Sequence, residues 1–345
     1  MERYCGKAVA FVRPRRAELC TDVLFPEMDE YGVVIKTEYS TISRGTELDL
    51  YTGQMHGRGE RAQWYPMLPG YMPAGEVIAV GERITHLKVG DCAVASNLFS
   101  GFDERYCCAW GGHCEYTVVS KQSHPALGGA RAVRIPDGVP TMYATLAVLG
   151  AVALHGVEEK VEPQRGETVL VVGQGVIGNF AAQLCKLAGA RVIVADAVER
   201  RLQVARQFAD AVIAGDALGK EFGGQVLEAT SGHGPDKIME VTGEPRILER
   251  MLTLVRPHGL VHAQGMYLEP ISIYIPETLF GRNLSLTATV GENPEHVAEV
   301  LALMAERKLT YEPLISRQMG VEEATSAYEL VHDYPEEVVT VSLKW

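Results

Sequence analysis

The rhythm of hydrophobic and polar positions changes near residue 150. Before that point, short apolar or alternating runs are separated by Gly, Pro and Asp turns, a pattern typical of β-strands. The runs cover residues 7–12, 33–41, 75–80, 92–96 and 115–119. The first 150 residues are therefore expected to form a compact, mostly β domain.

From residue 168 onward, short apolar runs alternate with stretches of helical periodicity. Strands are predicted at 169–172, 192–196, 211–214, 237–243, 260–265 and 284–290, and helices at 180–187, 201–208, 221–230 and 246–255. Alternation of this kind predicts a parallel sheet with helices on both faces. Residues 151–290 are thus expected to form an α/β domain, with 284–290 as its edge strand.

The last segment predicts a return to the first domain. Residues 294–307 and 321–331 have helical periodicity, and 338–343 has the pattern of a strand. We therefore expect an α/β protein of two domains, one formed by 1–150 with 291–345 and the other by 151–290.

Composition narrows the classes of partner. The 345 residues include 32 basic and 44 acidic side chains, for a net charge of −12. This balance argues against nucleic acid or an anionic membrane as partner, and favours a small-molecule substrate. No apolar run approaches the roughly 18 residues that span a bilayer, and the N-terminus lacks a signal pattern. Seven cysteines without disulfide-framework spacing indicate a reducing cytoplasm.

The most specific motif is Gly173-Gln-Gly-Val-Ile-Gly178, which follows the apolar run 169–172. In the G-x-G-x-x-G pattern, Gly173 permits a tight turn, Gly175 lets the backbone approach a pyrophosphate, and Gly178 allows close helix–strand packing. The N–H groups at the start of the next helix, including those of Val176 and Ile177, favour phosphate binding. We expect a dinucleotide site here.

An acid and a set of later turns complete the expected cofactor site. Asp196 ends the second strand of this unit, where a carboxylate accepts hydrogen bonds from ribose hydroxyls and repels a 2′-phosphate. NAD is therefore favoured over NADP, although Arg200 and Arg201 could soften the preference. Ligands of parallel sheets lie beyond the carboxyl ends of the strands. The residues expected beside the nicotinamide half are Thr242, Gly243, Gly265 and Met266.

Together with the glycine motif, two stretches of the first domain resemble the medium-chain dehydrogenase/reductase superfamily over nearly the whole chain. Zinc alcohol dehydrogenases of that superfamily have Cys-Gly-Thr/Ser-Asp and Pro-Gly-His-Glu, whereas this chain has Arg44-Gly-Thr-Glu47 and Pro69-Gly-Tyr-Met72. The resemblance implies a GroES-like catalytic domain and a Rossmann domain. It also places Arg44 and Tyr71 where zinc ligands stand, and residues 143–155, where zinc members supply another Cys or Glu, contain no soft ligand or carboxylate. We expect no catalytic zinc, because zinc needs three or four N, S or O⁻ ligands.

A structural zinc site is also not expected. Cys107, Cys108, His113 and Cys114 lack C-x-x-C spacing, so partly buried thiols beside a glycine turn are favoured. The Ile-Ser-Arg-Gly-Thr-Glu and Leu-Pro-Gly-Tyr strings are most similar to the zinc-lacking bacteriochlorophyllide a dehydrogenase branch. That branch oxidises a hydroxyethyl side chain of a chlorophyll precursor, and it merges into dehydrogenases of polyols and sugars.

Alcohol oxidation without zinc needs a group that accepts the hydroxyl proton and a group that stabilises the oxyanion. By its place in the resemblance, Tyr71 is the expected proton-transfer residue. Arg44 is the expected cation near Tyr71 or the substrate, and Thr46 matches the family hydroxyl that passes the proton onward. Alternatively, Arg44 pairs with Glu47 or Asp49, and Tyr71 is only a packed aromatic.

Three histidines offer other assignments, because His titrates near neutrality. His113 is the reserve acid/base, His155 is expected to be a core or interface residue, and His56 is expected in a mobile loop over the site, 53–63. The family also pairs the edge strand 284–290 between subunits, which implies a homodimer. The leading hypothesis is an NAD-dependent interconversion of secondary alcohol and ketone. The alternatives are a quinone or enoyl C=C reductase and a cofactor-binding protein without turnover.

Overall fold

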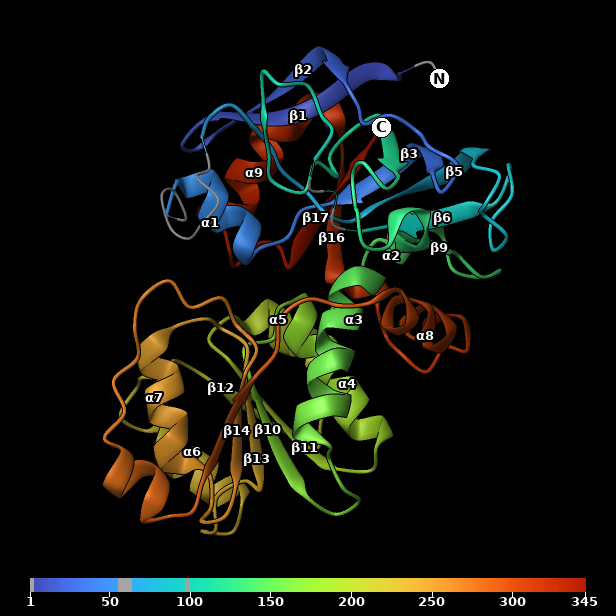
Figure 1. Ribbon diagram of the computed structural model, residues 1–345. Helices are drawn as coiled ribbons and strands as arrows, with labels where there is room; N and C mark the ends of the chain where they lie inside the picture. Colours follow the sequence, from blue (N-terminus) through green and yellow to red (C-terminus); the bar gives the residue numbers. More distant parts are fainter. Residues whose placement is uncertain (1–2, 55–63, 97, 99) are drawn as a thin grey trace. The chain divides into compact units, whose positions relative to one another are not determined.

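The computed structural model describes residues 3–54, 64–96, 98 and 100–345, and its chain divides into two compact units. Unit 1 comprises Met1–Val148 and Asn293–Trp345, and unit 2 comprises Leu149–Glu292. Each unit has its own sheets and its own hydrophobic core, so each is described by itself. Figure 1 shows their elements coloured along the chain.

Unit 1 is built on two β-sheets, one with strand order β2-β1-β4-β7 and one with order β16-β17-β3-β5-β6-β9, in which β8 also pairs with β3. The strands are β1 Cys5–Arg13, β2 Arg16–Leu24, β3 Val33–Thr41, β4 Met67–Leu68, β5 Pro73–Val80, β6 Cys92–Ala95, β7 Cys107–Cys108, β8 Tyr116–Val119, β9 Ala132–Arg134, β16 Ile315–Gly320 and β17 Thr340–Lys344. Strand β17 lies antiparallel to β3, with Leu343 opposite Ser40. The predicted return of the chain to the first domain is therefore present in this sheet.

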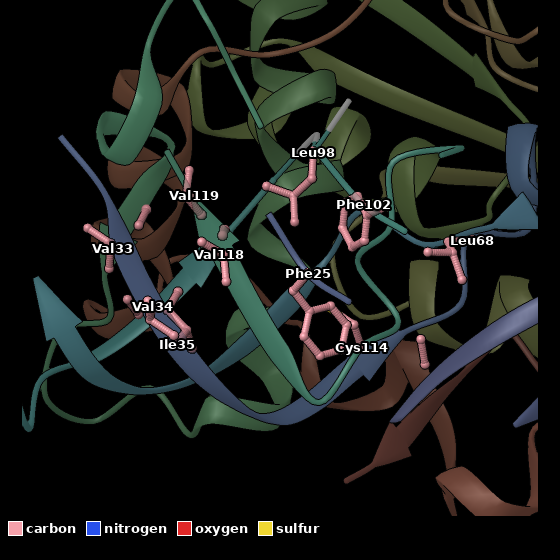
Figure 2. Close-up of a cluster of buried hydrophobic side chains, with 14 of the residues drawn as sticks. Phe25, Val33, Val34, Ile35, Leu68, Leu98, Phe102, Cys114, Val118 and Val119 are labelled. Atoms are coloured by element: carbon pink, nitrogen blue, oxygen red, sulfur yellow. The ribbon is translucent and has the colours of Figure 1, made fainter. Parts of the chain in front are cut away.

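Strand β3 is the centre of the larger sheet. It pairs with β5 over most of its length, and with β8 at its start and β17 at its end. Val33, Val34 and Ile35 are fully buried although they are consecutive, since both faces of this strand are covered. They pack with Phe25, Phe102 and the side chains of β8 in the core that Figure 2 shows.

Four α-helices and several short turns complete unit 1. A second core packs α9 (Ala324–Asp333) against β1 and α1 (Thr46–Thr52). In it, Phe11, Tyr51 and Tyr328 are in edge or stacked contact. The helices are α1 Thr46–Thr52, α2 Thr141–Ala144, α8 Pro294–Ala305 and α9 Ala324–Asp333, with the short turns η1 Gly128–Arg131, η4 Glu312–Leu314 and η5 Val321–Glu323.

Unit 2 is a six-stranded parallel sheet with strand order β12-β11-β10-β13-β14-β15. Helices α6 and α7 lie on one side of the sheet and α4 on the other (Figure 1). The elements are η2 Val157–Val161, β10 Thr168–Val172, α4 Val176–Leu187, β11 Arg191–Asp196, α5 Glu199–Ala205, β12 Ala211–Ala214, α6 Phe222–Ala229, β13 Lys237–Glu240, α7 Pro245–Leu254, β14 Leu260–Ala263, η3 Pro276–Phe280 and β15 Ser285–Ala288. The α/β class is confirmed, because unit 1 is built on β-sheets and unit 2 on a parallel sheet covered by helices.

The apolar run that precedes the glycine motif forms β10, in the interior of this sheet. Val169, Leu170, Val171 and Val172 are each 1% exposed or less. Parallel strands covered on both faces have continuous rather than alternating apolar sequences. Full burial of such a side chain contributes about 1.5–3 kcal/mol, so this strand is a main anchor of the unit.

The structure has elements that the sequence analysis did not predict, among them the strands β2, β4, β7, β9 and β16. Strand β2 was not predicted, because its residues Arg16–Leu24 mix charged and apolar side chains and only one face is buried. The expectation that no apolar run is long enough to cross a membrane was wrong, since one helix in the described residues, Thr141–Val161, passes that test by length and composition. Its most apolar window is 67% buried inside the protein, which is the pattern of a core helix.

Candidate functional site

The glycine motif forms the turn between β10 and α4. Gly173 has φ +95°, a conformation that L side chains rarely adopt. A methyl group on Gly178 would overlap the carbonyl oxygen of Gly173, because helix and turn touch there. Gly175 is the N-cap of α4, and a methyl group there would meet nothing within 4 Å. The turn is therefore closed on its helix side and open at Gly175.

The open side of this turn fits a pyrophosphate. The N–H groups of Val176, Ile177 and Gly178 come in the first turn of α4, where a helix supplies no carbonyl partner for them. They and the positive end of the helix dipole favour an anion at the space beside Gly175. A dinucleotide thus fits the residues present, since a larger side chain at Gly175 would fill the space that its phosphates need.

Asp196 has both a structural and a ligand-facing position. It ends β11 and is 8% exposed; one carboxylate oxygen accepts the Gln174 N–H at 2.6 Å and the other accepts the Val198 N–H at 2.8 Å. The Arg201 Nη1 lies 3.5 Å from the same carboxylate. The Arg201 Nε is buried without a partner in the part of the chain that the structure describes. Asp196 therefore fixes the glycine turn, and Arg201 keeps a donor for a further ligand.

The four residues predicted beside the nicotinamide half lie together. Thr242 and Gly243 follow β13, and Gly265 and Met266 follow the neighbouring parallel strand β14. A methyl group on Gly243 would lie 2.5 Å from the Met266 carbonyl oxygen, and one on Gly265 would lie 2.5 Å from the Gly243 Cα. The two turns are in direct backbone contact, and Thr242 also lies against Gly173.

A buried carboxylate that the sequence analysis did not single out holds one of these turns. Glu240 is fully buried and accepts hydrogen bonds from the Thr242 N–H at 2.7 Å, the Gly243 N–H at 3.3 Å and the hydroxyls of Thr242 and Tyr267. Burial raises the pKa of Glu240, and these four donors oppose the rise. Burial, together with the Glu240 carboxylate, also raises the pKa of Tyr267. The signal in the sequence was an acid at the end of an apolar strand, as at Asp196.

In unit 1, Tyr71 is hydrogen-bonded to a residue other than those predicted with it. Its hydroxyl donates to the Oγ of Ser43, and its ring is in edge contact with Trp110 at 5.5 Å between centroids. Ser43 lies in the loop between β3 and α1 and is 3% exposed. Thr46, the predicted relay, begins α1 and makes no side-chain hydrogen bond within the described residues. The structure therefore places Ser43 at the Tyr71 hydroxyl.

Arg44 is anchored to the C-terminal helix of unit 1. Its Nη1 donates to the carbonyl oxygen of Val331 in α9 at 3.0 Å. Of the two acids in the alternative pairing, Glu47 accepts hydrogen bonds from donors other than Arg44. Burial raises the pKa of Asp49 to about 6.

Those donors form a buried network around Glu47. The His113 Nε2 lies 2.9 Å from Glu47 Oε1, which also accepts the Tyr328 hydroxyl, and Glu47 Oε2 accepts the Ser43 N–H at 3.2 Å. Glu47 and Tyr328 are fully buried and His113 is 1% exposed. Burial, followed by the charge of Glu47, raises the pKa of Tyr328 well above its usual value. His113 is therefore sealed in the core, where it orients Glu47 rather than meeting a substrate.

The network continues to the last residue of the sequence. His113 Nδ1 lies 2.7 Å from the Ser40 Oγ, which accepts the Trp345 Nε1–H at 2.8 Å. Sequence patterns did not point to Ser40, Ser43 or Tyr328, nor to Glu47 as the centre of this network. The available signal was a single acid, Glu47, directly before the apolar stretch of α1.

The described residues at the zinc-ligand positions of the superfamily do not fit a zinc ion. Arg44 and Tyr71 are not a soft or carboxylate ligand pair, and no group of three or more His, Cys, Asp or Glu among the described residues is arranged to hold a metal. Cys107 and Cys114 are buried thiols, and burial raises the pKa of Cys114 to about 12, against the thiolate that zinc requires. His113 of that cluster is bonded to Glu47 and Ser40.

The two other histidines are outside this chemistry. His155 lies on α3 Ala147–Gly156 in unit 2, with Nδ1 3.0 Å from the Gly291 carbonyl and Nε2 3.3 Å from Glu159. It is a hydrogen-bonded packing residue, as expected. His56 and the predicted loop around it lie outside the described residues, apart from Gly53 and Gln54 at its start.

Two family models match the chain. Residues 29–137 match the alcohol dehydrogenase GroES-like domain, and residues 176–306 match the zinc-binding dehydrogenase domain. The chain is similar to L-threonine 3-dehydrogenase of Pyrococcus abyssi, with 27% identity over 94% of each chain. It is also similar to D-arabitol-phosphate dehydrogenase of Enterococcus avium, with 22% identity over 90% of this chain and 89% of the other.

Solved structures have the same fold. One is described as a short chain alcohol dehydrogenase of E. coli CFT073 complexed with the cofactor NADH. It superposes with a TM-score of 0.82 at 23% identity, covering 99% of both chains. The fold is thus shared over nearly the whole length of both chains.

Proposed function

We propose that the chain, an NAD(P)-dependent dehydrogenase of CH–OH groups similar to the medium-chain dehydrogenase/reductase superfamily, interconverts a secondary alcohol and a ketone without zinc. In this proposal Tyr71 moves the proton of the alcohol and unit 2 holds the cofactor. When bound, the nicotinamide accepts or donates the hydride. The proposal departs from the zinc-binding members of the superfamily in the groups that accept the alcohol proton and stabilise the oxyanion.

One observation carries the zinc-free proposal. The position that corresponds to a zinc-binding histidine is occupied by Tyr71, whose hydroxyl is hydrogen-bonded to the nearly buried Ser43. A phenol with a hydroxyl partner can exchange a proton, whereas a metal would need anionic or imidazole ligands that this place lacks. Arg44 at the other ligand position carries a positive charge, which repels a metal ion and favours an oxyanion.

For the cofactor we propose NAD. The carboxylate of Asp196 repels a 2′-phosphate, and it keeps capacity for a ribose hydroxyl, because a carboxylate offers about four acceptor sites. The two N–H donors and Arg201 occupy three of them. Arg201 weakens the preference for NAD over NADP without reversing it, because the charge of Arg201 is partly compensated by Asp196.

For the substrate we propose a secondary alcohol on a larger molecule, namely a hydroxyethyl group of a tetrapyrrole or a polyol or sugar. The similarity of the strings around Arg44 and Tyr71 to the bacteriochlorophyllide a dehydrogenase branch supports the first. The similarity to D-arabitol-phosphate dehydrogenase supports the second. Reduction of NAD by the purified protein, measured with one member of each class, separates them.

The test of the reaction is a Tyr71→Phe variant assayed for turnover and NAD binding. We expect kcat to fall roughly a hundredfold or more, as for loss of a general acid/base, while the Kd for NAD stays unchanged. Tyr65→Phe is the matched control, because its hydroxyl donates to the Leu50 carbonyl in the same unit. Unchanged turnover in Tyr71→Phe would remove its proposed role.

Zinc independence has its own test. Elemental analysis of the active protein should find no stoichiometric zinc, and a chelator should leave kcat intact. Loss of activity on chelation with recovery on added zinc would contradict the proposal. Bound NAD without turnover on alcohols or ketones would favour a C=C reductase if enones react, or a binding protein if they do not.

We further propose that the protein is a homodimer through the edge of the unit 2 sheet. Strand β15 has a partner only on its β14 side within the described residues. Nearby apolar side chains are strongly exposed, with Tyr274 at 65%, Phe280 at 72% and Val290 at 82%. A second copy of this edge would pair the free strand and cover these side chains. Light scattering should give twice the chain mass, and Phe280→Asp should shift it toward the monomer, whereas Tyr334→Asp, an exposed site in unit 1, should not.

The absence of disulfides among the seven cysteines supports a reducing cytoplasm as the location. None of the seven is in a disulfide, and Cys107, Cys114 and Cys185 are buried as thiols. Labelling of the unfolded protein by a thiol reagent before reduction should find all seven reactive.

A further inference from the structure

The hydrogen bond at Tyr71 is part of a chain of contacts that crosses unit 1. From the Tyr71 hydroxyl it passes to the Ser43 Oγ, and from the Ser43 backbone N–H to the carboxylate of Glu47. Glu47 is held in turn by His113 and Tyr328. The backbone of Ser43 is therefore held by Glu47, and its side-chain hydroxyl contacts the phenol of Tyr71.

The donors and acceptors of this network determine what Glu47 does. Tyr328 stays protonated, because its pKa is raised, and so it donates to Glu47. The Ser43 N–H can only donate, so Glu47 accepts from both sides as a carboxylate. His113 Nε2 then carries a proton toward Glu47, and the Ser40 hydroxyl bonds to His113 Nδ1. Every member of the network has a partner, which makes the position of Ser43 rigid.

We infer that Ser43 is the positioning residue that controls the protonation of Tyr71, the part that the family resemblance gives to Thr46. This inference rests on the proposed function. Two hydroxyls that face each other can form their hydrogen bond in either direction. When Tyr71 is a phenolate, the Ser43 O–H donates to it; when Tyr71 is a phenol, its O–H donates to the Ser43 Oγ.

This reversal matches the proton balance of alcohol oxidation. When NAD⁺ is bound, its nicotinamide would accept the hydride that leaves the alcohol carbon with the electron pair of the broken carbon–hydrogen bond. The O–H proton of the alcohol moves to the Tyr71 phenolate oxygen, and the ketone forms. Ser43 gains and loses no proton in this step, because only the direction of its hydrogen bond changes. The phenol proton is later released to water, and Ser43 again donates.

The hydroxyl of Ser43 accepts from Tyr71 and can also adapt to a phenolate by donating. Glu47 meets the Ser43 backbone rather than its side chain, Tyr328 points to Glu47, and His113 lies on the far side of that carboxylate. The charged Arg44 is bonded to Val331 in α9. A hydrogen bond to the phenolate stabilises the charged form, so Ser43 lowers the pKa of Tyr71 relative to a side chain without a hydroxyl.

The experiment measures the titration of Tyr71 directly. The ultraviolet absorbance of phenolate is followed against pH in the full-length protein, and the titration of Tyr71→Phe is subtracted to isolate one tyrosine among the 14. In Ser43→Ala the midpoint should rise by about one pH unit or more, since a hydrogen bond to a charged group is lost. The kcat at neutral pH should fall about tenfold and recover at alkaline pH.

Ser123→Ala is the matched control, because it removes a fully buried hydroxyl from the same unit, bonded to the Val118 carbonyl. It should leave the Tyr71 midpoint unchanged. If Ser43→Ala does not fold, Ser43→Cys keeps a weak donor of similar size and should give a smaller rise in the same direction. An unchanged Tyr71 midpoint in the Ser43 variants overturns the inference. If the wild-type protein oxidises no alcohol, the proposed function fails, while the titration still decides the contact between Ser43 and Tyr71.

Discussion

Substitution by alanine is expected to have different effects at two glycines of the same turn. In Gly178→Ala, the new methyl group would meet the Gly173 carbonyl oxygen well under 3.0 Å and its carbonyl carbon at 2.9 Å. These are backbone atoms, so no side chain can rotate to make room. In Gly175→Ala, the methyl group would meet nothing within 4 Å, and φ is −67°, which alanine adopts freely.

The magnitudes follow from this difference. Overpacking costs roughly 1–3 kcal/mol, and a rigid backbone neighbour places Gly178→Ala at the upper end, about 3 kcal/mol. Alanine regains about 1 kcal/mol of helix propensity at this helical position, so the net loss is about 2 kcal/mol. For Gly175→Ala, the weaker N-cap and the smaller unfolded-state entropy oppose each other, and the net change is near zero.

Binding and stability should therefore separate. Thermal unfolding of the cofactor-free protein should give a Tm lowered by roughly 4–8 °C for Gly178→Ala and nearly unchanged for Gly175→Ala. NADH fluorescence titration should show weaker binding in Gly175→Ala, because the methyl group fills the space where a phosphate approaches the backbone. Equal Tm losses in the two variants, or wild-type NADH affinity in Gly175→Ala, would refute this reasoning.

Two further predictions concern carboxylates. Bonds from the Arg105 side chain hold the pKa of Asp103 at about 2, below its ordinary 3.8; a carboxylate with a lowered pKa stabilises the fold above its unfolded pKa and loses that effect as pH falls. Urea unfolding should thus show Asp103→Asn less stable than wild type at neutral pH, by about 1 kcal/mol because solvent screens the exposed Arg105, with the gap closing between about pH 4 and 2. Asp196→Ala should narrow the NAD/NADP ratio of kcat/KM and also lower the Tm, because the Gln174 and Val198 N–H groups lose their acceptor. A lower ratio with unchanged Tm would show that the structural role of Asp196 is negligible.

Local patterns predicted the unit 2 elements well for a physical reason. Its strands are short, buried on both faces and followed by amphipathic helices, so each βα step is visible within about 20 residues of sequence. The turn residues Thr242, Gly243, Gly265 and Met266 could be placed together because parallel strands align their carboxyl ends. In unit 1, the contact of Tyr71 with Ser43 joins residues 28 apart. The contact of Tyr328 with Glu47 joins residues 281 apart, and no periodicity encodes such pairs.

The pairing of β17 with β3 has a consequence for how the protein is synthesised. Strand β3 leaves the ribosome early, but its partner at Ser342, Leu343 and Lys344 comes some 300 residues later in the chain. At about 5–20 residues per second, β3 waits roughly 15–60 s for that partner. Unit 2, Leu149–Glu292, is contiguous and needs no later residue for its sheet. We therefore expect the cofactor-binding unit to mature first on the ribosome, while the open edge of β3 is the part of the nascent chain most in need of a chaperone.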